Sequence, residues 1–183
     1  MSTATTALPT GTWNVDASHS RVGFRVKHFG ISTVHGKFGE FEGRLVIADD
    51  GTAAAEGTVK AASVDTADEG RDTHLRSADF FDVEQYPDIT FQSTSVTAKD
   101  EDTYEIVGDL TMHGVTKPIT LTAELGGQDV DPWGNERIGL EATGTINRSD
   151  WDMKFNMAMG SGNAVVSDKI KLELDVEAVK ASE

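Results

Sequence analysis

The stretch from Ser20 to His28 most constrains the fold, because its side chains alternate strictly between apolar and polar. Side chains of a strand point to opposite faces with a period of two, so this pattern predicts a half-buried β-strand. The apolar row is Val22, Phe24, Val26 and then, unexpectedly, His28. Either His28 is a hydrogen-bonded core residue, or the inner face of this sheet surrounds something other than side chains.

The same alternation recurs to the end of the chain, in about eight predicted strands joined mostly by short turns. An antiparallel sheet with one apolar face must close into a barrel or pair as a sandwich. We expect an all-β antiparallel barrel, because the inner rows include the small residues Gly108, Ala123, Ala142 and Gly144. A barrel of about eight strands can hold a ligand when side chains do not fill its interior.

The 183 residues are expected to form one domain over residues 12–180, preceded by a disordered leader at 1–11. One stretch breaks the strand pattern. Residues 66–81 have no period of two, and Arg71, His74 and Leu75 instead have helical spacing. This stretch predicts one short helical insert, which Thr66 or Asp68 could cap.

Four glycines that follow the first predicted strand indicate where the chain could bend. Gly30, Gly36, Gly39 and Gly43 follow one another closely after the first strand. Glycines within strands are typical of sharp bends and bulges. We therefore expect the chain to bend or bulge at these positions.

Composition excludes several kinds of partner and chemistry. The net charge is −15, which argues against nucleic acid and against electrostatic docking on anionic membranes. The absence of cysteine excludes disulfides, thiolate catalysis and cysteine-based zinc sites. No secretion signal and no apolar run long enough for a transmembrane segment is recognisable, so a cytoplasmic location is expected.

Neither a metal site nor a catalytic site is predicted. The histidines show no helical metal-binding pair, so a metal would need ligands from distant strands. Asp72, His74 and Ser77 are the residue types of a hydrolytic triad, but they crowd one predicted helix and lack a nucleophile-elbow motif. An enzyme acting on an isoprenoid or acyl substrate, with His28 or His74 as acid–base, is the alternative.

Two further groups of residues have both a structural and a functional interpretation. Basic residues near predicted loops could form surface ion pairs or hold an anionic head group; the candidates are Arg71, His74, Lys117 and Arg148. Trp151, Met153 and Met157 follow the penultimate strand. They could be a loop folded over the core, or a flexible lid over a lipid tail, since methionine suits irregular apolar shapes.

Several motifs together resemble the YceI-like family, in family order and over residues 12–178. The matching segments are WNVD (13–16), HS (19–20), VGFRVKH (22–28), GKF (36–38), RDTHLRSADFFD (71–82), YPDITF (86–91), GDLTMHGVTKP (108–118) and NRSDW (147–151). This resemblance implies an extended, lipocalin-like barrel with a long apolar channel. The implied ligand is a polyisoprenoid or similar long-chain amphiphile, such as an isoprenoid quinone or a prenyl phosphate, with no enzymatic activity and no other cofactor. Many family members carry a secretion signal.

The alternation and the resemblance together predict which side chains would contact the lipid. The expected tail contacts are Phe24, Val26, His28, Phe38, Phe91, Leu110, Met112, Leu121, Leu140, Ile146, Trp151, Met153 and Met157. The four basic candidates above are the expected head-group contacts. A homodimer is compatible with the sequence. A further alternative is a stress-response or assembly protein whose core is filled and whose loops bind a partner.

Overall fold

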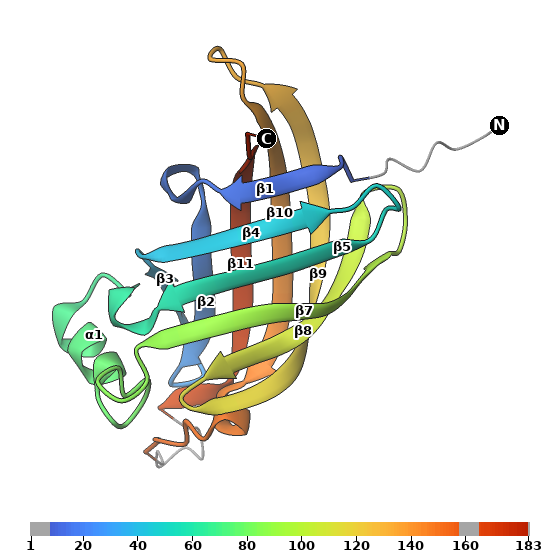
Figure 1. Ribbon diagram of the computed structural model, residues 1–183. Helices are drawn as coiled ribbons and strands as arrows, with labels where there is room; N and C mark the ends of the chain where they lie inside the picture. Colours follow the sequence, from blue (N-terminus) through green and yellow to red (C-terminus); the bar gives the residue numbers. More distant parts are fainter. Residues whose placement is uncertain (1–7, 158–164, 183) are drawn as a thin grey trace.

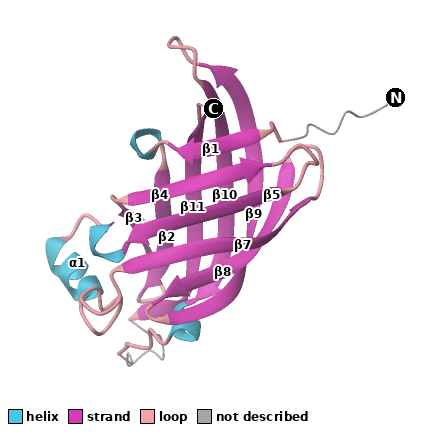
Figure 2. Ribbon diagram, in the orientation of Figure 1, coloured by secondary structure: helices cyan, strands magenta, loops and turns pink. Residues whose placement is uncertain are grey.

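The computed structural model describes residues 8–157 and 165–182 as a single antiparallel sheet with one α-helix (Figure 1 and Figure 2). The strands are β1 (Gly11–Val15), β2 (Arg21–His28), β3 (Ser32–Phe38), β4 (Phe41–Ile47), β5 (Ala53–Lys60), β6 (Val64–Asp65), β7 (Asp88–Ala98), β8 (Thr103–Met112), β9 (Val115–Val130), β10 (Glu136–Asn147) and β11 (Val166–Lys180). The helix is α1 (Glu69–Arg76), and short 3-10 helices are η1 (Ala17–His19), η2 (Ala61–Ser63) and η3 (Arg148–Trp151).

Eight of these strands close into a lipocalin-like barrel. The order around the ring is β1, β4, β5, β7, β8, β9, β10 and β11, and β11 then pairs with β1. Every pair in the ring is antiparallel. This ring confirms the predicted all-β antiparallel barrel of about eight strands. Closure pairs strand edges that would otherwise be exposed.

Strand β11 closes the barrel. One of its edges pairs with β10, and the other edge pairs with two strands in turn. Residues up to Asp175 pair with β2, and Ala178–Lys180 pair with β1. Between these two strands the chain turns through η1, where the Asp16 carboxylate accepts a hydrogen bond from the Ser18 N–H at 3.1 Å. Beyond this turn β2 pairs with β3 while β1 pairs with β4, so the wall divides at one end.

The helical insert covers the divided end of the wall (Figure 1). Asp68 is the N-cap of α1, because its Oδ1 accepts from the Arg71 N–H at 2.8 Å. At the other end of the helix, Arg76 donates to the carbonyl oxygens of Ala62 and Val64 at 2.9 and 3.2 Å. The insert was predicted over residues 66–81, but only 69–76 are α-helical and the following residues form turns.

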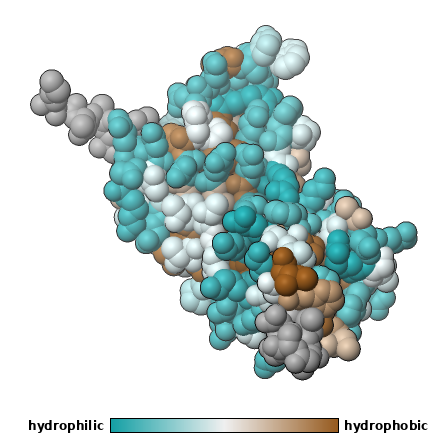
Figure 3. Space-filling view, turned by 180° about the vertical axis from the view of Figure 1, so that it is seen from behind, coloured by the Kyte–Doolittle hydropathy of each residue, from teal (hydrophilic) through white to brown (hydrophobic). Residues whose placement is uncertain are grey.

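The alternation of the sequence becomes an inside and an outside of the barrel. Inner rows face one another across the interior, and the face of the molecule seen in Figure 3 is mostly hydrophilic. Two of the expected bends are absent, however. Gly36 and Gly43 lie within regular ladders, directly opposite Phe24 and Gly57. Of the expected leader, residues 1–7 lie outside the described residues, and β1 begins at Gly11.

The end of the barrel near the termini is filled by an apolar cluster around Trp13. Trp13 is 1% exposed, and its indole N–H donates to the Pro9 carbonyl oxygen at 3.0 Å. Leu45, Ile47, Ile138 and Ala178 complete the buried cluster from three further strands. The indole N–H therefore has a hydrogen-bond acceptor, as is usual for a buried tryptophan.

A cluster of ion pairs centred on Arg137 stabilises the end of the barrel near the termini. Arg137 Nη1 donates to Asp16 at 2.9 Å and to Glu177 at 2.8 Å, and Nε donates to Asp131 at 2.8 Å. The Ser18 hydroxyl and then Arg137 hold the pKa of Asp16 well below its usual range. Arg137 likewise lowers the pKa of Asp131. One guanidinium thus links η1, the β9–β10 loop and β11.

We expect Arg137→Gln to lower the free energy of unfolding at pH 7, and to lower it less at pH 3. A carboxyl with a depressed pKa stabilises the fold above its unfolded pKa of about 3.9 and loses that contribution as the pH falls. Urea unfolding of both proteins at the two pH values measures the difference. If the two proteins differed equally in free energy of unfolding at pH 7 and at pH 3, Arg137 would not be the cause of the low carboxyl pKa values.

Candidate functional site

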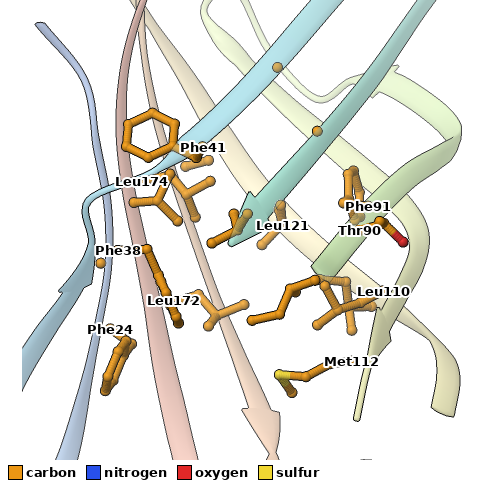
Figure 4. Close-up of a pocket in the computed structure, with 18 of the residues that line it drawn as sticks. Phe24, Phe38, Phe41, Thr90, Phe91, Leu110, Met112, Leu121, Leu172 and Leu174 are labelled. Carbon is orange, nitrogen blue, oxygen red and sulfur yellow. The ribbon is translucent and has the colours of Figure 1, made fainter. Parts of the chain in front are cut away.

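An apolar cavity with a volume of about 320 Å³ occupies the barrel interior (Figure 4). Side chains from many strands and from the helical insert point into it; those labelled in Figure 4 include Phe24, Phe38, Phe91, Leu110, Met112, Leu121, Leu172 and Leu174. Inward-facing Leu172 and Leu174 are only half-buried, because empty space lies in front of them. The volume is of the size that small-molecule ligands occupy.

The wall of the cavity between β4 and β5 carries small residues. Gly43 and Gly57 are cross-strand partners, and the inward-facing neighbour Ala55 is also small. Outward-facing Arg44 and Glu56, which form an ion pair, also border the cavity at this place. Both side chains are substantially exposed, and Arg44 is the cross-strand partner of Asn14 in β1.

Most of the predicted tail contacts line this cavity. They are Phe24, Val26, Phe38, Phe91, Leu110, Met112, Leu121, Leu140, Ile146 and Met153. Nine of them come from six different strands, where each occupies an inward position, and Met153 lies in the loop after η3. The alternation in the sequence was the signal that identified them.

Three of the predicted tail contacts do not line the cavity. His28 is half-buried at the end of β2, with its ring 3.8 Å from that of Phe29. Trp151 is 2% exposed and donates from Nε1 to the Leu110 carbonyl oxygen at 2.9 Å, so it is part of the core beside the cavity. Met157 is 61% exposed.

The predicted head-group cations do not surround one opening. Arg71 donates to the hydroxyl and the carbonyl oxygen of Thr66, both at 2.7 Å, and so stabilises the start of the insert. His74 lies 2.9 Å from an Asp79 carboxylate oxygen, and its ring packs edge-on against those of Phe80 and Phe155. Lys117 is exposed on β9, away from the cavity lining.

Arg148 alone among these cations lines the cavity, and its donors are directed at the backbone. Its guanidinium donates to the carbonyl oxygens of Met153, Ser167 and Val166 at 2.7, 3.1 and 3.2 Å. The side chain is 4% exposed, and this burial lowers the pKa of the group from its ordinary value. Arg148 therefore holds together both ends of the loop that leads into β11.

The triad residue types of the insert have separate local partners. Asp72 accepts from the N–H and the hydroxyl of Thr66. The Ser77 hydroxyl donates to the carbonyl oxygen of His74 at 2.6 Å rather than to its ring. A nucleophile, a base and an orienting group that converge on one point are needed for this chemistry, and these three residues do not supply them.

Asp16, His19 and Glu177 are the one group of described residues whose ligand atoms lie close enough to hold a metal ion, within 4.8 Å of one another. Arg137 already donates to both carboxylates of this group. The guanidinium thus supplies the positive charge that a cation would bring.

Sequence reasoning missed the contribution of the helical insert to the cavity. Leu75, Phe80 and Phe81 line it, and the Phe81 ring packs edge-on against Phe38 with ring centroids 5.7 Å apart. No periodic pattern in residues 66–87 indicates which side chains face inward. The motif RDTHLRSADFFD marked the segment through the family resemblance, but not the role of its phenylalanines.

We expect Arg148→Met to lower the free energy of unfolding by about 3 kcal/mol, because buried carbonyl oxygens would lose a charged donor. Chemical denaturation measures this change. Arg148→Lys is the matched variant: it keeps the charge, but one ammonium cannot reproduce the fork of donors, so most of the loss should persist. Full stability of the lysine variant would show that charge alone matters.

Comparison with known proteins places this architecture in a family. The family model for the YceI-like domain matches residues 13–178. Protein YceI of Escherichia coli O157:H7 is 42% identical over 167 residues, which cover 90% of this chain and 84% of that protein. The crystal structure of the Campylobacter jejuni YCEI protein is 34% identical, with a TM-score of 0.72, over 85% of this chain and 90% of that one.

A more distant solved structure shares the fold. A domain from Saccharophagus degradans, described as a polyisoprenoid binding domain, has a TM-score of 0.68 at 18% identity, over 92% of this chain and 98% of that one. No helix among the described residues is long and apolar enough to cross a membrane. The sequence match over nearly the whole domain, together with the barrel and its insert, shows that this chain belongs to the YceI-like family.

Proposed function

We propose that this protein binds the hydrocarbon tail of a polyisoprenoid, or of a similar long-chain amphiphilic lipid, and thereby sequesters or carries it. The observation that carries this proposal is the apolar cavity of about 320 Å³ inside a closed barrel. The Saccharophagus degradans domain of the same fold is described as polyisoprenoid binding, which supports a binding role. An isoprenoid quinone and a prenyl phosphate are both candidate ligands.

Burial of the tail would supply most of the binding free energy. Each methylene group that leaves water contributes about 0.8 kcal/mol, so a tail that buries about ten of them gains about 8 kcal/mol before the entropic cost of binding. The lining has few polar groups that could compete with this effect; Thr58, Thr90 and Arg148 are among them. A largely apolar lining favours the tail as the recognised part of the ligand.

The alternatives have less support. A filled core does not agree with the cavity, and the histidines proposed as acid–base, His28 and His74, do not line it. Turnover of a prenyl ester that disappears in His74→Ala would nevertheless favour an enzyme. The cytoplasmic location and the homodimer stay predictions.

We expect Ala142→Trp to reduce lipid uptake strongly while the protein still folds. Ala142 lines the cavity, opposite Ala123 on one side and Leu174 on the other, so an indole here would project into the space for the tail. Overfilling an interior typically costs about 1–3 kcal/mol, which most folds tolerate. The measurement is uptake of the C45 polyprenol solanesol by delipidated protein, read by native mass spectrometry.

Ala54→Trp is the matched control, because Ala54 is exposed on the outer face of β5 and does not line the cavity. It should take up solanesol as the unaltered protein does. Thermal unfolding checks that both variants are folded. Undiminished uptake by folded Ala142→Trp would count against the cavity as the binding site.

A further inference from the structure

Three inward-facing glycines lie beneath large side chains that line the cavity. Gly36 of β3 is the clearest, because Phe24 of β2 is its direct cross-strand partner. A Cβ atom on Gly36 would lie only 2.6 and 2.8 Å from Cε1 and Cε2 of Phe24. The Phe24 ring therefore lies across the backbone of Gly36, against the wall of the barrel.

The same relationship occurs elsewhere around the cavity. A Cβ on Gly108 would lie 2.7 Å from Cε2 of Phe91, and a Cβ on Gly144 would lie 2.7 Å from Cδ2 of Leu121. In each case the covering side chain belongs to a neighbouring strand and lines the cavity. Figure 4 shows Phe24 and Phe91 on opposite sides of the cavity, with Leu172 and Leu121 drawn between them.

Space, and not backbone conformation, explains these glycines. None of the three has a positive φ angle, so any residue could adopt the backbone there. A side chain at any of these positions would fill the recess that receives the covering side chain. At Gly36 the three nearest atoms to an added Cβ all belong to the Phe24 ring, so the recess is filled by that ring.

A ring displaced from this recess has one free direction. On its other flank Phe24 faces Leu172 of β11, and the Phe38 ring lies 5.7 Å away, centroid to centroid. The cavity in front of Phe24 is the empty space beside it. A methyl group at position 36 would thus move the ring into the cavity and narrow it at that level.

We propose that the Gly36–Phe24 pair sets the cross-section of the cavity, and so makes it wide enough for methyl-branched isoprenoid tails as well as for straight acyl chains. This inference rests on the proposed function. An isoprenoid chain carries one methyl branch for every four carbons of its main chain, so it needs a wider passage than an unbranched chain of equal length. Large lining side chains that lie over glycines of the wall provide that width.

Phytol and hexadecanol test this proposal directly, because both have a sixteen-carbon main chain and only phytol is branched. Binding of each to delipidated protein is measured by titration calorimetry. We expect Gly36→Ala to weaken phytol binding about tenfold, as the loss of about two buried methyl groups would, and to change hexadecanol binding by less than about twofold. Equal effects on both alcohols, or no effect, would overturn the proposal.

Two further variants separate the ring from other consequences of the added methyl. In the double variant Gly36→Ala with Phe24→Ala the ring is gone, so phytol binding should recover. Phe24→Trp keeps Gly36 but carries a ring too large for the recess, so it should lose phytol selectively even if Gly36→Ala does not fold. Failure of both predictions would overturn the role of the ring.

Gly39→Ala is the matched control, since the nearest atom to its added Cβ is a backbone oxygen 3.9 Å away, outside the cavity lining. It should bind both alcohols as the unaltered protein does. The outcomes also distinguish this inference from the proposed function. If the unaltered protein binds neither alcohol nor solanesol, the lipid-binding function itself fails; if it binds them and Gly36→Ala is not selective, only the role of Gly36 fails.

Discussion

Closure of the sheet through β11 is the constraint on which the rest of the structure depends. This strand pairs with β10 along one edge, and with β2 and then β1 along the other. Once the ring is closed, every second side chain must face the interior, whatever its size. The amount of free space inside is then decided by the residues at those positions, and many of them are glycine or alanine.

Different elements fill the two ends of this interior. Near the termini, Trp13 and its neighbours form a buried cluster, braced on the outside by the ion pairs of Arg137. At the divided end, the insert contributes Phe80 and Phe81, and Arg148 fixes the loop before β11. The free space between these ends is therefore a consequence of where the chain puts large side chains and where it omits them.

The alternation of single strands predicted the barrel and most of its inner wall, because the period of two depends only on local backbone geometry. It placed Phe24, Phe91 and Leu121 on the inner face, where they lie. It could not show where the cavity ends along a strand, which is why His28 was included. It also could not show the partners of buried polar groups: Arg148 and Arg71 bond backbone oxygens that come near them only in the folded protein. The glycines at 36 and 43 were expected to bend the chain, whereas their role is to leave room beside neighbouring strands.

We propose that the empty interior of the barrel holds a lipid tail. Native mass spectrometry of the protein, purified gently from its own host, tests this most directly, with identification of any bound lipid after denaturation. We expect a stoichiometric adduct, which denaturation releases as a long-chain isoprenoid or related amphiphile. A bare protein from a host rich in such lipids would contradict it.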